Sequence, residues 1–476
     1  MKILSEILED IKILESHGNL EAKVSFVSLN SKEIEPHSVF VAIIGNIVDG
    51  HTFIDEVIGK GATTIIHEKE ITDFKSGVTY VKVADTHSAV GIIASNFYGN
   101  PSRKMKLVGV TGTSGKTTTA TLLHQLFREL GYKVGMMGTV VNKINDSETE
   151  AHRTTPDAVT LNKLLAEMVD NGCEYCFMEV SSHSVSEKRI QGLSFAGGIF
   201  TNLSLDHLDY HKTFNEYCDA KKGFFDMIPA SGFAIANIDD EKGEYMLSTT
   251  KATKYTLSLK KEADFNERFE SNLIGEFNAY NILGVYATAV LLGQDKEKIK
   301  EIIKILKTVP GRFQYVKGED GIIGIIDYAH KPDALENVLK TANQMKGKGK
   351  LICVVGCGGN RDRSKRPIMA KIGYDMSDIL ILTSDNPRTE KPEDILEEMQ
   401  KGLPKNAEVE HLSGQGQSLY KKVYIIENRH KAIEKACSLA LAGDIILIAG
   451  KGHETYQEVN GVQTHFDDME ELKKNL

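Results

Sequence analysis

The stretch Thr111-Gly112-Thr113-Ser114-Gly115-Lys116-Thr117-Thr118 decides the fold of the central part of the chain. It follows an apolar run at 106–110 that is typical of a buried strand. The segment after it has the period of an amphipathic helix, with an apolar face formed by Leu122, Leu123, Leu126, Phe127 and Leu130, and with Gly131 just past the helix end. A strand, a glycine-rich turn and a helix in this order predict a loop that binds phosphate groups.

The loop has the chemistry that a nucleoside triphosphate requires. Its glycines let backbone N–H groups converge on phosphate oxygens, and the helix N-terminus adds positive partial charge. We expect Lys116 to reach the β- and γ-phosphates of ATP and the Thr117 hydroxyl to bind Mg²⁺. Val110 stands where the strict Walker pattern has its first glycine, and a turn with a surface lysine is the alternative interpretation. The predicted ATP contacts in the loop are Gly112, Thr113, Ser114, Gly115, Lys116, Thr117 and Thr118.

Two polar segments follow the next apolar strands, which are predicted at 174–180 and 197–203. Glu179 ends the first of these strands, and His207 lies in Asp206-His207-Leu208-Asp209-Tyr210-His211 after the second. Because the carboxyl ends of parallel strands meet at one edge of a sheet, we expect both side chains near the phosphates. They are candidate Mg²⁺ ligands, although a nitrogen ligand is unusual for this metal. For each residue alone, an ordinary polar position is the alternative.

The chain divides into three blocks, in keeping with about 150 residues per domain for a length of 476. The first, 1–103, has short strand-like runs and ends at the linker Tyr98-Gly99-Asn100-Pro101-Ser102. The second, 104–312, and the third, 313–476, alternate apolar strands with helical segments such as 332–345. This alternation predicts an α/β fold with parallel sheets covered by helices. Further strands are predicted at 39–42, 62–66, 79–83, 321–326, 351–355, 379–383 and 445–449.

Composition excludes several classes of protein. The 57 basic and 66 acidic residues give a net charge of −9, which argues against a general nucleic-acid binder. No apolar run approaches the roughly 18 residues of a membrane span, so no membrane insertion is expected, and residues 1–20 lack the pattern of a secretion signal. Cys173 and Cys176 have CxxC spacing without a second pair, so we predict buried free thiols and a reducing, cytoplasmic location.

Five segments carry a resemblance to a known family, and they are GTSGKTT (112–118), MEVSSH (178–183), TNLSLDHLDYH (201–211), DYAHKPDAL (327–335) and GKGHE (450–454). In this order they resemble the Mur ligases of peptidoglycan synthesis, and the resemblance covers essentially the whole chain. It implies an ATP-dependent ligase that activates a carboxylate as an acyl phosphate and joins it to the amine of an amino acid. It also implies a UDP-substrate domain at 1–103, a central P-loop ATPase domain at 104–312 and a Rossmann-like amino-acid domain at 313–476.

The resemblance assigns residues beyond the loop to the substrates. For the UDP-substrate it implies contacts from Ser28, Ser31, Thr154, Thr155, Ser182 and Arg189. For the rest of the nucleotide it implies contacts from Asn278, Asn281, Arg312, Asp327 and His330. Lys221 matches a lysine that is carbamylated in this family, and a carbamate would be an anionic Mg²⁺ ligand. The implied catalytic residues are Lys116, Glu179, His207 and Lys221, and the implied metal ligands are Thr117, Glu179, His207 and Lys221.

The amino-acid end is implied to consist of Arg361, Asp385, Asn386, Arg388, Gly450 and Glu454. Asp385-Asn386-Pro387-Arg388 resembles the signature of the forms that add meso-diaminopimelate. Arg388 suits the distal carboxylate of that amino acid, and Asp385 and Glu454 suit its ammonium. Lysine lacks the carboxylate and would leave Arg388 unmatched, at a cost of roughly 2–4 kcal/mol. The sequence departs from the common family pattern at Asn30, Lys32, Gln314 and Asn360.

The implied reaction joins meso-diaminopimelate to the D-Glu γ-carboxylate of UDP-MurNAc-L-Ala-D-Glu, with ATP and Mg²⁺, in a cytoplasmic monomer. His207, His183 or water would receive the proton that the amine loses. The alternatives in the same class are an L-lysine-adding or other Mur-type ligase and a folylpolyglutamate synthetase. Two alternatives come from other classes of protein. One is a P-loop kinase that phosphorylates a small molecule, and the other is a regulatory protein that binds a nucleotide but catalyses no reaction. Phosphate release that requires an amine separates a ligase from a kinase.

Overall fold

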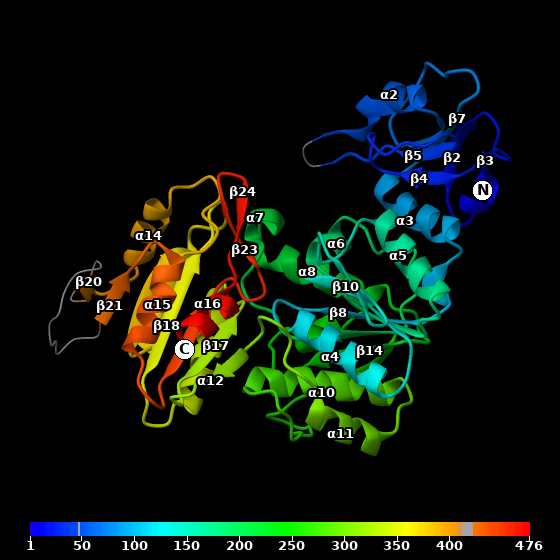
Figure 1. The fold of residues 1–476 in the computed structure, drawn as a ribbon. Coiled ribbons are helices and arrows are strands. Elements are labelled where there is room, and N and C mark those ends of the chain that lie inside the picture. The colour runs from blue at the N-terminus through cyan, green and yellow to red at the C-terminus, as the bar shows by residue number, and fades with distance from the viewer. Residues whose placement is uncertain (46–47, 406, 411–421) are drawn as a thin grey trace. The chain divides into compact units, whose positions relative to one another are not determined.

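The computed structural model describes the chain apart from residues 46–47, 406 and 411–421 (Figure 1). Its strands form three large sheets that combine with helices, which confirms the predicted α/β class with three domains. The residues group into two compact units, Met1–Arg268 with Tyr280–Ile303 and Phe269–Ala279 with Lys304–Leu476. The boundaries after residues 103 and 312 stay predictions. No helix in the described part of the chain is long and apolar enough to cross a membrane.

The first domain is built on a five-stranded sheet with the order β2-β7-β6-β5-β4. β4 to β7 are parallel, and β2 pairs antiparallel with β7 at the edge. Ile93 of the helix α3 packs with Val39 and Val81 in an apolar core beneath the sheet. The elements are β1 (Lys2–Ile3), α1 (Leu4–Ile7), β2 (Ile13–His17), β3 (Lys23–Val24), β4 (Phe26–Ser28), β5 (Ser38–Val41), α2 (Ile54–Gly59), β6 (Ala62–His67), β7 (Thr79–Val83) and α3 (Thr86–Phe97).

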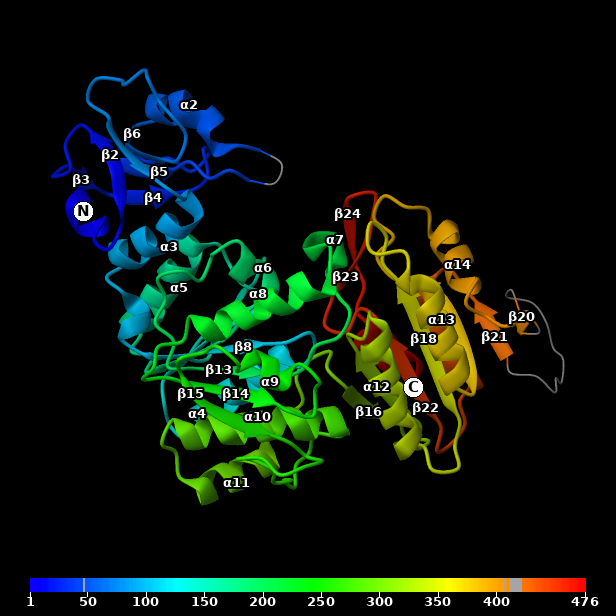
Figure 2. The ribbon, with the colours of Figure 1, turned by 180° about the vertical axis from the view of Figure 1, so that it is seen from behind.

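The central domain holds an eight-stranded sheet with the order β11-β10-β9-β12-β8-β13-β14-β15. Its strands are parallel except for β10 and β11, which form an antiparallel edge that the sequence pattern did not predict. Figure 2 shows helices on both faces, with α8 on one and α10 on the other. The strands are β8 (Lys106–Thr111), β9 (Val134–Met137), β10 (Val141–Ile144), β11 (Ser147–Glu150), β12 (Tyr175–Glu179), β13 (Gly197–Phe200), β14 (Phe233–Asn237) and β15 (Thr253–Leu257).

Helices α4 to α11 accompany this sheet. They are α4 (Lys116–Glu129), α5 (Ala158–Asp170), α6 (Ser182–Ser186), α7 (Leu208–His211), α8 (Phe214–Asp226), α9 (Gly243–Met246), α10 (Glu276–Leu291) and α11 (Lys296–Ile305). The predicted end of α4 is confirmed, because Gly131 has a φ of 93° and the Tyr132 N–H donates to Phe127 O at 3.0 Å. The strand predicted at 197–203 ends at Phe200, because Thr201 and Asn202 turn toward the phosphate loop.

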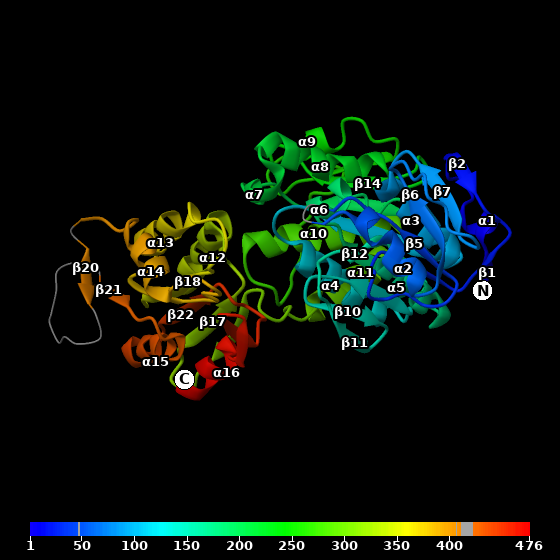
Figure 3. The same ribbon diagram turned by 90° about the horizontal axis from the view of Figure 1, so that it is seen from above.

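The C-terminal sheet has seven strands in the order β16-β17-β22-β18-β19-β21-β20, and β16 alone among them is antiparallel to its neighbour. In Figure 3, α12, α13 and α14 lie on one face of this sheet and α15 and α16 on the other. All residues of β18 are buried, as expected for a parallel strand covered on both faces. The strand predicted at 321–326 begins two residues later, because Gly321, with a φ of 80°, belongs to the preceding turn.

The elements of this part of the chain are β16 (Gln314–Lys317), β17 (Ile323–Asp327), α12 (Pro332–Met345), β18 (Leu351–Cys357), α13 (Lys365–Met376), β19 (Ile379–Ser384), α14 (Pro392–Gln400), β20 (Glu408–Glu410), β21 (Lys422–Ile425), α15 (Arg429–Leu439), β22 (Ile445–Ala449), β23 (Tyr456–Val459), β24 (Val462–His465) and α16 (Asp468–Asn475). The helix predicted at 332–345 is confirmed with the same bounds. β23 and β24 form a separate hairpin. Cys173 and Cys176 are buried free thiols, as predicted.

Candidate active site

The phosphate loop is fastened to the end of β13 by the side chains of Thr201 and Asn202, for which no role was predicted. The Ser114 N–H donates to Asn202 Oδ1 at 3.0 Å, and the Thr113 N–H donates to Asn202 O at 2.8 Å. The Thr201 hydroxyl donates to Ser114 O at 2.6 Å. These bonds fix the backbone of the loop at the edge of the sheet where ligands of α/β folds bind.

Two glycines allow the close packing of this loop. Gly112 has a φ of 146°, and a Cβ there would lie 1.9 Å from Thr201 Oγ1. Gly115 has a φ of 86°, and its Cβ would lie 2.6 Å from Asn281 Oδ1. Both the backbone conformation and the contacts exclude larger residues. The same contacts bring Asn281, a predicted nucleotide residue from α10, to the loop.

Two lysine ammonium groups meet at one carbonyl oxygen of the loop. Lys116 Nζ donates to Gly112 O at 2.9 Å and to Thr113 O at 3.0 Å. Lys221 Nζ, from α8, donates to the same Gly112 O at 2.7 Å. Lys221 is buried, and its ammonium lies 4.7 Å from the ring centre of Tyr217. Two positive charges that share one carbonyl oxygen repel each other. An anionic phosphate group bound beside Gly112 O would offset that repulsion.

Glu179 ends β12 directly beside the strand that leads into the loop. In the sheet register it lies opposite Val110. Its Oε1 accepts the Thr139 N–H at 2.7 Å, and its Oε2 accepts the Thr139 hydroxyl at 3.1 Å. The side chain is only 1% exposed. The structure therefore places Glu179 at the expected strand end and adds Thr139 as the residue that orients its carboxylate.

His207 belongs to a cluster of rings near the loop. Its backbone is left-handed, with a φ of 51°, at the start of α7. Its Nε2 lies 3.0 Å from Asp206 Oδ2, and its ring centre lies 4.8 Å from that of His183. Nearby, His211 Nε2 lies 2.9 Å from the hydroxyl of Ser182, the first residue of α6. Ser182, a predicted substrate contact, is thus part of this histidine-lined region.

The residues predicted to bind Mg²⁺ fit that ion in part. Mg²⁺ prefers oxygen ligands and usually keeps waters and substrate phosphates among them. The Thr117 hydroxyl, in the first turn of α4, and the Glu179 carboxylate, at the end of β12, meet that preference, whereas Lys221 as an ammonium does not. Among the described residues, no group of three or more His, Cys, Asp and Glu side chains converges as a metal site.

Three of the residues predicted to bind the UDP-substrate meet beside Glu179. The Thr155 hydroxyl donates to Glu179 O at 2.9 Å, and Arg189 Nη1 donates to Thr155 O at 2.9 Å. The Thr139 hydroxyl, which donates to the Glu179 carboxylate, also has its oxygen within hydrogen-bond distance of Thr154 Oγ1, at 3.2 Å. One hydrogen-bonded group therefore connects the predicted diphosphate clamp with the predicted metal ligand.

The other two predicted UDP-substrate residues belong to the first domain. Ser28 ends β4, and its Oγ accepts the Asn30 N–H at 3.0 Å. Ser31 follows, and its carbonyl accepts from Lys60 Nζ at 2.8 Å. Asn30 Oδ1 accepts the Lys32 N–H at 3.0 Å, which is the turn-stabilising bond that an aspartate would make at this departure from the family pattern.

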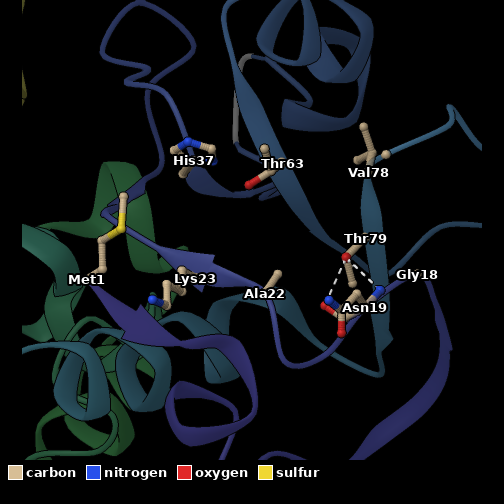
Figure 4. Close-up of a pocket in the computed structure, with 10 residues that line it drawn as sticks. Met1, Gly18, Asn19, Ala22, Lys23, His37, Thr63, Val78 and Thr79 are labelled. Atoms are coloured by element: carbon tan, nitrogen blue, oxygen red, sulfur yellow. Dashed lines mark hydrogen bonds between the residues drawn. The ribbon is translucent and has the colours of Figure 1, made fainter.

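A cavity of about 640 Å³ lies at the amino ends of strands in the first-domain sheet, away from the strand end that carries Ser28 (Figure 4). His37, Thr63 and Thr79 line it at the amino ends of β5, β6 and β7. Ser28 lies at the carboxyl end of β4, which is the edge where α/β sheets bind ligands. The cavity therefore does not contain the residues predicted for the uridine end.

The remaining nucleotide residues occur on α10 and around Tyr328. Asn278 and Asn281 are buried one helical turn apart, and Asn278 Nδ2 donates to Ile274 O at 2.8 Å. Asp327 ends β17 and His330 follows, with His330 Nδ1 at 2.8 Å from Tyr328 O.

Arg312 stacks on Tyr328, with its guanidinium carbon 4.3 Å from the centre of the tyrosine ring. Asp327 Oδ2 accepts the Phe313 N–H at 2.7 Å. Burial raises the pKa of Asp327 to about 6, although the charge of Arg312 acts in the opposite direction. The structure thus brings Arg312, Asp327 and His330 together around Tyr328.

The predicted amino-acid residues Asp385, Asn386 and Arg388 follow β19. Asp385 and Asn386 are buried, and the Asn386 N–H donates to Asp385 Oδ1 at 2.7 Å. Arg388 has a left-handed backbone, with a φ of 53°. β23 holds it there, since the Arg388 N–H donates to Glu458 O at 3.1 Å and the Asn460 N–H donates to Arg388 O at 2.7 Å. The hairpin β23–β24 is therefore part of the support of this loop.

Gly450 and Glu454 follow β22 and reach the same group. A Cβ at Gly450 would lie 2.7 Å from Asp385 Oδ2, so the backbone approaches that carboxylate closely. Glu454 Oε2 accepts from Asn386 Nδ2 at 2.8 Å. Two carboxylates from different strand ends are thereby joined through one asparagine.

Arg361 completes the predicted set from the turn after β18. A Cβ at Gly358 would lie 3.0 Å from Arg388 Nη1 and 3.8 Å from Arg361 Cγ, so both arginines flank this glycine. Asn360 has a left-handed φ of 54°, and its Oδ1 accepts from the Thr389 N–H and hydroxyl at 3.1 and 2.9 Å. An amide oxygen serves here as well as the carboxylate that the family pattern has, because only acceptors are needed.

Comparison with known families identifies the chain. The model described as "Mur ligase middle domain" matches residues 110–269, and "Mur ligase, glutamate ligase domain" matches 311–452. "Mur ligase family, catalytic domain" matches 23–98, so the three matches cover most of the chain. The chain belongs to the Mur ligase family.

Relatives of this Mur ligase match it from end to end. The UDP-N-acetylmuramoyl-L-alanyl-D-glutamate–2,6-diaminopimelate ligase of Cytophaga hutchinsonii is 49% identical over 99% of both chains. The protein of that name from Bacteroides fragilis is 48% identical over 99% of this chain and 98% of its own. A solved structure of a UDP-N-acetylmuramoyl-L-alanyl-D-glutamate–2,6-diaminopimelate ligase has a TM-score of 0.70 at 29% identity, and covers 100% of this chain and 99% of that one.

A buried ion pair braces the amino-acid end of this Mur ligase. Arg429, at the start of α15, donates to both carboxylate oxygens of Asp468 at 2.7 Å, and both side chains are 0% exposed. It also donates to Ser384 O and Ala449 O, the last residues of β19 and β22. The pair therefore joins the two strand ends from which the predicted amino-acid contacts emerge to the C-terminal helix α16.

We expect Asp468→Asn to lower the free energy of unfolding by about 3–5 kcal/mol, because it leaves the buried guanidinium of Arg429 without a matching charge. Urea denaturation followed by circular dichroism measures this change. Asp394→Asn, on the exposed surface of α14, is the matched control and should change stability by less than about 0.5 kcal/mol. Equal stability of the two variants would contradict the bracing role.

Proposed function

We propose that this Mur ligase adds meso-diaminopimelate to the D-Glu γ-carboxylate of UDP-MurNAc-L-Ala-D-Glu, at the expense of ATP. The observation that carries the proposal is the gathering of Arg388, Asp385 and Glu454 at the ends of β19 and β22. A guanidinium fork suits a carboxylate, and two carboxylates suit an ammonium. Those are the two charged groups at the far end of diaminopimelate. The names of the full-length relatives agree with this assignment.

The proposed reaction has two steps. A γ-carboxylate oxygen of D-Glu attacks the γ-phosphorus of ATP, an acyl phosphate forms and ADP leaves. The amine of diaminopimelate then attacks the acyl carbon, a C–N bond forms, phosphate leaves and the nitrogen loses a proton. Lys116 and the loop N–H groups stabilise the charge of the transferring phosphoryl group, because they are fixed before the reaction begins.

Mg²⁺, when bound, neutralises charge on the β- and γ-phosphates and so favours attack by an anionic carboxylate. We assign it to the Thr117 hydroxyl and the Glu179 carboxylate, with His207 and a carbamylated Lys221 as the further predicted ligands. Thr139 keeps the Glu179 oxygens oriented through two hydrogen bonds. Thr154, Thr155, Ser182 and Arg189 would hold the sugar-peptide and diphosphate, and Ser28 and Ser31 the uridine end. Asn278, Asn281, Arg312, Asp327 and His330 would hold adenosine.

Carbamylation of Lys221 forms an N–C bond between its neutral amine and CO₂ with loss of one proton. The proposal is supported by the crowding of two ammonium groups at Gly112 O, which conversion of Lys221 would relieve. We expect Lys221→Ala to lose about 10²- to 10³-fold in turnover, and a short-chain carboxylic acid to restore part of it. Steady-state phosphate release with and without the acid measures this. Lys222→Ala, the neighbour that pairs with Asp226, should keep activity and show no rescue; wild-type turnover in Lys221→Ala would dismiss the carbamate.

Phosphate release tests the proposed function against its alternatives. The protein is given ATP, Mg²⁺ and UDP-MurNAc-L-Ala-D-Glu, with meso-diaminopimelate, with L-lysine or with no amino acid. We expect release only with meso-diaminopimelate. Release with lysine would make the chain a lysine-adding ligase. No release with either amino acid would favour a kinase, which keeps the phosphoryl group on its substrate, or a nucleotide-binding protein without chemistry. The cytoplasmic location and the monomeric state remain predictions, which fractionation and light scattering test.

A further inference from the structure

A fully buried lysine occupies the centre of the amino-acid end. Lys451 lies in the turn after β22, and its side chain is 0% exposed. Its Nζ lies 3.0 Å from Asn386 Oδ1, 3.1 Å from Glu454 Oε2 and 5.3 Å from the ring centre of Tyr456. Burial of an ammonium is costly unless it is paired and hydrogen-bonded, so these contacts are what keeps the charge in place.

The partners of Lys451 are two residues of the predicted amino-acid site, and it fixes how both are oriented. Asn386 Oδ1 accepts from Lys451 Nζ and from the Glu458 N–H at 3.0 Å, while its Nδ2 donates to Glu454 Oε2. The reversed amide would set an NH₂ group against an ammonium and a second donor. The ammonium thus determines which end of the Asn386 amide faces Glu454.

The same ammonium engages one oxygen of Glu454 and orients the other. Oε2 accepts from both Lys451 and Asn386, whereas Oε1 has the Tyr328 hydroxyl at 3.5 Å, a long contact. The Glu454 side chain is 16% exposed, so the carboxylate is held from behind but still reaches the surface of the site. A carboxylate held in this way offers a fixed acceptor to an incoming ammonium.

Lys451 also acts on the second carboxylate of the site. Burial acts to raise the pKa of Asp385, but the positive charges of Arg429 and Lys451 outweigh burial and lower that pKa below its usual value. The site can therefore keep the Asp385 carboxylate ionised in a buried setting, as recognition of an ammonium requires.

We propose that Lys451 is a positioning residue of the amino-acid site, which orients Asn386 and the Glu454 carboxylate that receives the substrate's ammonium. The inference rests on the proposed function. It assigns Lys451 no contact with the reacting atoms. This role explains why a lysine stands between the two glycines of GKGHE (450–454), since a turn by itself does not require a lysine there.

The test compares Lys451→Met, which removes charge and donor, with Lys451→Gln, which keeps an N–H donor without charge. We expect Lys451→Met to raise the KM for diaminopimelate by roughly 10- to 150-fold, the effect of losing hydrogen bonds to charged groups, with the KM for ATP nearly unchanged. Lys451→Gln should recover part of the KM. In both variants the acidic limb of kcat/KM for diaminopimelate should move to higher pH, because Asp385 then loses the nearby positive charge that lowers its pKa.

The matched control is Lys431→Met on the exposed face of α15, which should leave both KM values and the pH profile unchanged. Folding of each variant is checked by circular dichroism and thermal unfolding. The proposal would be overturned if folded Lys451 variants had the wild-type KM for diaminopimelate. It would also be overturned if the acidic limb of their kcat/KM profile did not shift. Loss of the folded state in both variants would also overturn it, because Lys451 would then serve the core alone. Wild-type turnover is measured first, since its absence would overturn the proposed function itself.

Discussion

Lys116→Ala will lose about 10²- to 10³-fold in turnover while it keeps its fold. Lys116 Nζ rests on two carbonyl oxygens of its own loop, Gly112 O and Thr113 O, and the loop is fixed independently through Asn202 and Thr201. Removal of the ammonium therefore takes away stabilisation of the transferring phosphoryl group without releasing the loop. Phosphate release measures turnover, and circular dichroism with thermal unfolding measures the fold.

The control for this prediction is Lys106→Ala. Lys106 begins β8, is exposed and lies on the same strand that leads into the loop. Its replacement should change neither turnover nor thermal stability by much. Turnover of Lys116→Ala close to that of the control would refute the assignment of residues 111–118 to ATP.

Arg388→Ala will lower kcat/KM for meso-diaminopimelate by about 30- to 1000-fold, or roughly 2–4 kcal/mol, and will change the KM for ATP little. The guanidinium is set before the substrate arrives. The left-handed backbone of Arg388 is held by Glu458 and Asn460 of the hairpin, and Nη1 donates to Gly359 O at 2.9 Å. A side chain fixed in this way contributes its full hydrogen-bonding geometry to a carboxylate.

Arg363→Ala is the matched control for Arg388. Arg363 lies in the same part of the chain, its side chain is 64% exposed and it pairs with Glu398. Exposed pairs contribute little, so this variant should retain diaminopimelate use. We also expect Arg388→Ala to narrow the preference for diaminopimelate over lysine, because the variant lacks the group that binds the distal carboxylate. If Arg388→Ala weakened the use of ATP as much as the use of diaminopimelate, the assignment of Arg388 to the distal carboxylate would be contradicted.

Local sequence signals predicted the elements whose stability is local. The helix at 332–345 was predictable because Pro332 opens it and its apolar positions recur with helical spacing. Gly131 marked the end of α4 for a similar reason. The antiparallel edge strands β10, β11 and β16 were missed, because short, partly exposed strands have no continuous apolar run. The end of β13 was misplaced, because contacts of Thr201 and Asn202 with a distant loop decide it.

The residues of the candidate site also differ in how far the sequence alone could predict them. The phosphate loop was evident from its own pattern, and Glu179 and His207 were indicated by their positions after predicted strands. The remaining groups of residues were indicated only by resemblance to a family. At Gln314, one of the departures from that family pattern, the side chain supplies an acceptor, since its Oε1 accepts the Gly311 N–H at 3.0 Å. Lys451 and Arg429 gave no sequence signal of their roles, because buried cations are recognised only through the partners that the fold brings to them.

The most direct test of the central claim is the mass of the product from a competition. The protein is incubated with ATP, Mg²⁺, UDP-MurNAc-L-Ala-D-Glu and equal amounts of meso-diaminopimelate and L-lysine, and the nucleotide product is analysed by mass spectrometry. A product heavier than the substrate by one diaminopimelate residue is the expected result. A product heavier by one lysine residue would contradict the role of Arg388, and an unchanged substrate mass would contradict the ligase itself.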